Sequence, residues 1–92
     1  MIVRIAGEGQ FHLPDEDAAR LNELDNDAVA AAEAGDQARF LELWHRMLEL
    51  VETDGTPLDS EELSESNVIL PPRDISFEEA QGEFTGEGLI PD

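Results

Sequence analysis

Two histidines are the residues of this chain best suited to acid–base or metal chemistry. His45 lies in a helical pattern with Glu42 and Glu49, so the three side chains would share one side of a helix. A metal site needs more ligands in fixed geometry and supporting hydrogen bonds, and one histidine beside glutamates is more often a solvated surface residue. His12 lies between two apolar residues of a strand-like segment and would face away from both. We therefore predict no metal site.

The other chemical candidates are carboxylates, serines and one glycine-rich turn. Acidic residues number 23 in 92, so close pairs arise by chance, and a catalytic pair would also need a concave apolar pocket. Asp25-Asn26-Asp27 lacks the glycine of a calcium loop and falls inside a helical pattern. Gly7-Glu8-Gly9 lacks the third glycine of a dinucleotide-binding loop, because that position is His12. The chain has no cysteine, and no serine lies in an activating motif. We predict no catalytic, cofactor-binding or metal-binding residue, and no enzyme.

Charge excludes two further classes of ligand. The chain carries five arginines, no lysine and a formal net charge of −18. A field this negative repels nucleic acid and anionic lipid, and no apolar run is long enough to span a bilayer. The first residues are also too short an apolar run for a signal peptide. We expect a cytoplasmic protein that reaches membranes only through a partner.

The same composition bears on the cell of origin. An apolar content of 40% predicts a folded chain in spite of the acids. Molar salt would screen their repulsion, so a halophilic source is favoured. The alternative is a lysine-poor proteome with an acidic adaptor protein in it.

Local patterns predict a single α+β domain over residues 1–92. Residues 1–13 read as a β-hairpin, with strands on either side of the glycine turn. Residues 15–34 and 36–53 read as helices that form an antiparallel hairpin, broken at Gly35 with Asp36 as the next N-cap. The second helix has a wide apolar arc that includes Trp44, which we predict to be core rather than an exposed anchor.

The last third is irregular. Residues 56–75 read as an extended linker, 76–85 as a short helix opened by a capping box at Ser76, and 86–92 as a tail. This third holds a few apolar residues in polar surroundings, which would either be buried against the helices or form a patch for a partner protein. The candidate partner-binding residues are Val68, Ile69, Leu70, Pro71, Pro72, Leu89 and Ile90.

The whole chain resembles the PspA-associated (PspAA) protein family, encoded beside phage-shock protein A. The resemblance rests on the opening residues 1–11, on short stretches at 21–26, 33–36 and 55–58, and on two more specific segments, 67–74 and 87–91. One departure is Ser66-Asn67, where the family often has Ser-Asp. With the acidic composition, the resemblance points to a haloarchaeal source.

The resemblance implies a non-enzymatic accessory or regulatory protein of the envelope-stress system built around PspA, a coiled-coil protein that assembles on stressed membranes. It carries over no functional residue and no cofactor. The suspected partner is a PspA-like protein, bound through charge complementarity and an apolar anchor. Two alternatives stay open: an acidic decoy that occupies a basic protein, and a small carboxylate-based hydrolase with a raised carboxyl pKa in a concave site.

Overall fold

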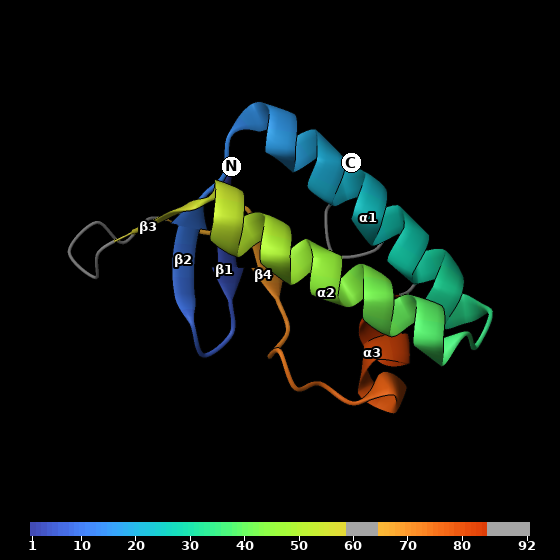
Figure 1. Ribbon diagram of the computed structural model, residues 1–92. Helices are drawn as coiled ribbons and strands as arrows, with labels where there is room; N and C mark the ends of the chain where they lie inside the picture. The colour runs from blue at the N-terminus through green and yellow to red at the C-terminus, as the bar shows by residue number, and fades with distance from the viewer. Residues whose placement is uncertain (59–64, 85–92) are drawn as a thin grey trace.

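A computed structural model describes residues 1–58 and 65–84 of the chain (Figure 1). Four strands form one sheet in the order β3-β2-β1-β4. Helix α2 crosses one face of this sheet, α1 lies along the side of α2 away from the strands, and a short helix, α3, lies near the other end of the two helices (Figure 1). This arrangement confirms the predicted α+β class with an N-terminal β-hairpin, a helical hairpin and a short helix after them.

The N-terminal half folds as local sequence signals predict. Strands β1 (Ile2–Ile5) and β2 (Gly9–His12) pair antiparallel, and the turn between them has positive φ at Gly7 and Gly9. Helix α1 (Asp15–Glu33) begins after Pro14 with three acids in its first turn, where they favour the positive end of the helix dipole.

Helix α2 begins after a tight break at Gly35, whose φ of 72° suits glycine. It spans Gln37–Asp54, and Asp36 Oδ1 accepts a hydrogen bond from the Arg39 backbone N–H at 3.1 Å. The predicted cap and boundary are therefore both present.

The segment predicted as an extended linker contributes two strands that the sequence did not predict. Strand β3 (Thr56–Pro57) pairs with β2, and β4 (Val68–Leu70) pairs parallel with β1. Asn67 fixes the start of β4, because its Oδ1 accepts from the Ile2 backbone N–H at 2.7 Å and its own N–H donates to the Ile2 carbonyl at 2.8 Å. Strands of two and three residues are too short to show a period, and nothing local signals a partner 65 residues away.

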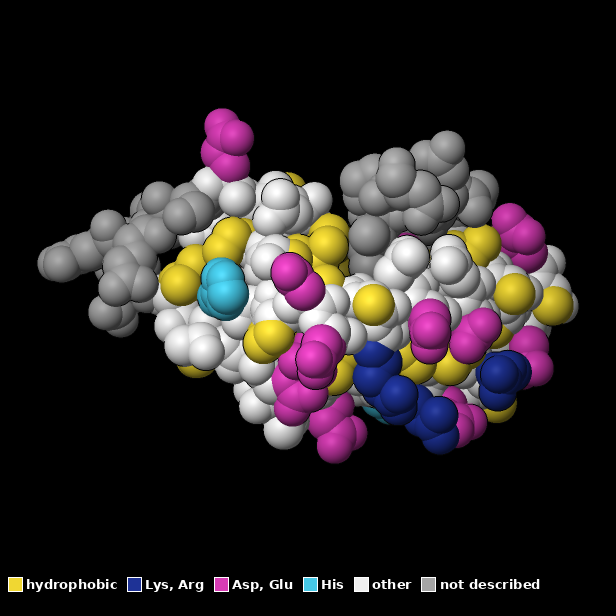
Figure 2. Space-filling model, turned by 90° about the horizontal axis from the view of Figure 1, so that it is seen from above, with side chains coloured by type: hydrophobic (Ala, Val, Ile, Leu, Met, Phe, Trp, Pro, Cys, Tyr) yellow, Lys and Arg dark blue, Asp and Glu magenta, His cyan; other side chains and the backbone are white. Residues whose placement is uncertain are grey.

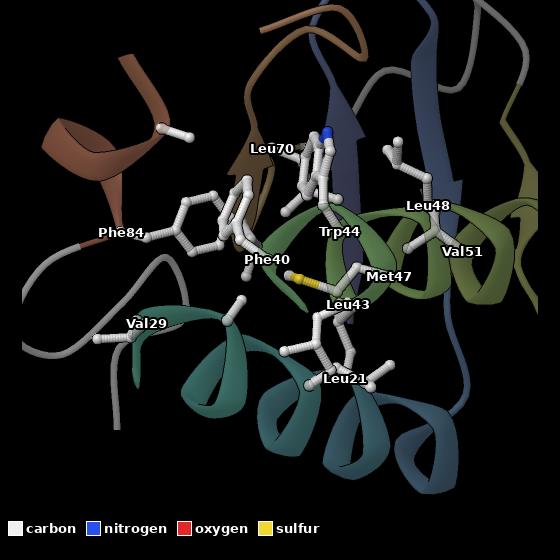
Figure 3. Close-up of a cluster of buried hydrophobic side chains, with 14 of the residues drawn as sticks. Leu21, Val29, Phe40, Leu43, Trp44, Met47, Leu48, Val51, Leu70 and Phe84 are labelled. Carbon is white, nitrogen blue, oxygen red and sulfur yellow. The ribbon is translucent and has the colours of Figure 1, made fainter. Parts of the chain in front are cut away.

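The core lies between the sheet and the helices, with α2 between α1 and the strands (Figure 3). Trp44 is 1% exposed, as predicted, and its indole N–H donates to the Arg73 carbonyl at 3.3 Å. Phe84 meets the rings of Trp44 and Phe40 edge-on, at centroid distances of 5.7 and 5.0 Å. These contacts hold the end of α3 (Phe77–Glu83) against α2.

Helix α3 is capped as predicted, since Ser76 Oγ accepts from the Glu79 backbone N–H at 3.2 Å. Gln81 Nε2 donates to the Ala32 carbonyl at 3.0 Å and so ties α3 to the end of α1. The predicted tail at 86–92 lies outside the described residues.

Gly55 leaves no space for a side chain, although its φ of −81° is one that any residue adopts. A Cβ at this position would overlap the Val51 carbonyl oxygen and would come within 3.2 Å of the Phe11 Cβ. We expect Gly55→Ala to lower the free energy of unfolding by about 1–3 kcal/mol, because the backbone at residue 55 must move away from the last turn of α2 and from Phe11 of β2. Urea titration measures this loss. Gly82→Ala is the control, since nothing lies within 4 Å of its added Cβ, and an equal effect in both variants would contradict the steric explanation.

Candidate interaction surface

The sheet has one face packed on the helices and one face turned away from them. Side chains alternate between the two faces along each strand. Val3 and Ile5 of β1 are buried, as are their direct partners on β4, Val68 and Leu70. The opposite face therefore carries the residues between them: Ile2, Arg4, Gln10, His12, Thr56 and Ile69.

Four of these residues form a patch that we call the outer-face patch: Ile2, Arg4, His12 and Ile69. The register pairs Ile2 with His12 and Arg4 with Ile69, so the four side chains are neighbours on adjacent strands. Arg4 and His12 are exposed and Ile2 is half-buried. Ile69 is 61% exposed, and it is the one exposed large hydrophobic residue in the described part of the chain.

This patch also differs in charge from the rest of the surface. No residue of β1, β2, β3 or β4 is acidic, in a chain where a quarter of the residues are. The nearby turn residue Glu8 is paired, since its carboxylate accepts two hydrogen bonds from the Arg73 guanidinium, at 2.9 and 3.2 Å. The outer-face patch is thus a basic and apolar region of a strongly acidic protein.

The partner-binding residues predicted from sequence differ in their burial in the structure. Val68 and Leu70 are buried in the core, Pro71 is half-buried, and Ile69 and Pro72 are exposed. Leu89 and Ile90 lie outside the described residues and stay predictions.

Sequence reasoning missed Arg4 as a neighbour of Ile69. Alternation along β1 signals that Arg4 faces away from the core, but only the β1–β4 pairing brings Ile69 beside it.

A second surface feature is a groove between α1 and α2, with a volume of about 300 Å³. Figure 2 looks onto the α1 side, where acidic side chains are spread over the surface and basic ones gather in small groups. The groove combines both signs and is lined by Arg20, Leu24, Arg46, Glu49, Leu50, Thr53 and Asp54. Within residues 1–58 and 65–84, no group of three or more histidines and carboxylates could hold a metal ion.

Comparison with protein families gives one match, to the family described as PspA-associated protein, over residues 1–92. The chain belongs to the PspAA family. The matched residues include every strand and helix of the described part of the chain. The family description indicates an accessory role linked to PspA systems.

The other comparisons add no relative of this PspAA chain. Neither the curated proteins nor the solved structures gave a match. Among the described helices, none is both long and apolar enough to cross a membrane.

Asp54 lines the PspAA groove, and its carboxyl group is close to that of Asp17 in the first turn of α1. Their side-chain hydrogen bond raises the pKa of Asp17 above its ordinary value of 3.8, with smaller contributions from desolvation and from the charge of Asp54. Since the folded state binds this proton more tightly than the unfolded state, the contribution of Asp17 to stability is fully present below pH 3.8 and is lost as pH rises through the raised pKa.

We therefore expect Asp17→Asn to be slightly more stable than the wild type at neutral pH, because it removes the repulsion and can still donate to Asp54. The advantage should vanish near pH 3, where the Asp17 carboxyl group of the wild type is itself protonated and can donate to Asp54. Melting temperatures from pH 3 to 7 measure this difference. Asp27→Asn, an exposed residue of the same helix, is the control. A stabilisation of Asp17→Asn that persists at pH 3 would contradict the assignment.

Proposed function

We propose that this chain is an accessory or regulatory protein of a PspA-based membrane stress response and that it acts by binding PspA in the cytoplasm. The observation that carries the proposal is the family match over the whole chain. An exposed apolar residue beside an arginine, on the acid-free face of the sheet, supports action through a protein surface.

Membrane contact in this proposal is indirect. The acidic surface repels anionic lipid, so PspA supplies the contact with the bilayer. The chain would follow PspA to the membrane and leave with it.

The test is co-purification of tagged protein with PspA, from the native cell and at its native salt concentration, with and without membrane stress. An acidic protein of similar size and charge is the control for non-specific capture. We expect PspA to be enriched with this chain and not with the control. Absence of enrichment under every stress condition would refute the proposal.

The excess of acidic over basic residues, 23 against five, favours a second candidate, an acidic decoy that occupies a basic protein. Ion pairs with arginine involve Glu8, Glu42 and Glu52. A decoy would bind a basic partner with an affinity that falls steeply with salt, whereas the PspA proposal needs binding that survives native salt.

A further inference from the structure

We propose that the outer-face patch is the surface that binds the partner, and that the matching partner segment carries a carboxylate beside aliphatic side chains. This inference rests on the proposed function and adds to it a binding surface and the chemistry of the opposing segment.

The first argument is the availability of Arg4. Of the arginines that form ion pairs in the described part of the chain, Arg46 pairs with Glu42, and Arg73 pairs with Glu8 and Glu52. Within residues 1–58 and 65–84, Arg4 has no such partner. A guanidinium with no carboxylate partner in the described part of the chain can donate two hydrogen bonds to a carboxylate of another protein.

The second argument is the apolar neighbour. Ile69 is directly opposite Arg4 in the register of β1 and β4, and both side chains face away from the helices. Burial of an isoleucine that is 61% exposed would remove apolar surface from water at the point where the ion pair forms. A segment that fits both residues must therefore offer a carboxylate next to an aliphatic side chain.

The third argument is long-range charge. A carboxylate that approaches this chain meets repulsion from most directions, because the net charge is −18. The strands carry no acid, and Glu8 at the nearby hairpin turn is already bound to Arg73. The described strands thus present no carboxylate of their own to an acidic segment that approaches the outer face.

The experiment measures the affinity of purified full-length chain for purified PspA by titration calorimetry, at native salt. Arg4→Glu reverses the charge at the patch, and Ile69→Thr keeps a β-branched side chain but removes apolar surface. Arg39→Glu is the matched control, because Arg39 is also exposed, and its side chain has no ion pair in the described part of the chain. We expect Arg4→Glu to weaken binding by about tenfold or more and Ile69→Thr by about threefold to tenfold, with Arg39→Glu within about twofold of wild type.

Folding is checked by the melting temperature of each variant. If the melting temperature of Arg4→Glu is lower than that of the wild type, Arg4→Gln replaces it, because Arg4→Gln removes the charge without reversing it. If PspA binds the wild type and the two patch variants equally well, the patch is the wrong surface and the proposed function still holds. If PspA does not bind the wild type at all, the proposed function fails and this inference fails with it.

Sedimentation equilibrium tests whether a second copy of this chain, rather than PspA, covers the outer-face patch. If the wild type is a dimer that Ile69→Thr converts to a monomer, a second copy of this chain covers the patch, and the inference is overturned. A wild type and an Ile69→Thr variant that are both monomers at the concentrations of the titration support it.

Discussion

Trp44→Ala is expected to lower the free energy of unfolding by about 3–5 kcal/mol. A chain of this size has only about 5–10 kcal/mol in total, so a large part of its stability would be lost. The cost has three sources in the structure. The indole is 1% exposed, its N–H donates a hydrogen bond to the Arg73 carbonyl, and its ring makes an edge-on contact with the ring of Phe84. Alanine would leave a cavity and release the link between α2 and the C-terminal third.

Urea unfolding followed by far-ultraviolet circular dichroism measures this loss without the tryptophan signal. Trp44→Phe is the matched control, because it keeps a ring against Phe84 and removes the hydrogen bond to the Arg73 carbonyl. We expect the control to cost about 1–2 kcal/mol. The wild-type fluorescence should also be blue-shifted when folded. A near-neutral Trp44→Ala would contradict the burial of this residue.

The second large effect concerns salt. The chain has 23 acidic residues and five arginines, and the ion pairs in the described part of the chain use only Arg46 and Arg73. The remaining carboxylates repel one another at low ionic strength and less so when the Debye length falls from about 10 Å at 0.1 M to about 3 Å at 1 M. We expect the melting temperature to rise by about 10 °C or more over this range, which corresponds to about 2 kcal/mol of stability.

Thermal melts in potassium chloride measure the rise. The same series at pH 3.5 is the control, because most carboxyl groups are then protonated and the salt effect should shrink. A melting temperature that does not change with salt at pH 7 would show that the repulsion is unimportant. A rise of equal size at both pH values would show that salt acts through something other than carboxylate charge.

Local sequence predicts some parts of this molecule and not others. The helical hairpin follows from signals within a few residues of its break, at Gly35 and Asp36, and α3 follows from its cap at Ser76. The wide apolar arc of α2 predicted burial of Trp44 on the correct face. By contrast, Asp25 is buried in the middle of α1, where the apolar pattern gives no reason to place a charge.

The candidate surface could be predicted only in part, for a similar reason. The apolar run at 68–70 marked the correct segment, but the period of a strand is what separates the exposed Ile69 from its buried neighbours Val68 and Leu70. The role of Arg4 depends on a parallel pairing between distant segments, and no pattern near Arg4 encodes that pairing.

The parallel pairing of β1 with β4 also has a consequence for folding during synthesis. Residues 2–12 leave the ribosome before residues 67–70 and can form their hairpin early, but the other edge of β1 has no partner until residues 67–70 emerge. Closure of such a long loop is slow, and an unpaired edge invites wrong pairing in the meantime. Strand β1 is therefore made early and gains its second partner late, and a net charge of −18 favours repulsion between nascent copies during that interval.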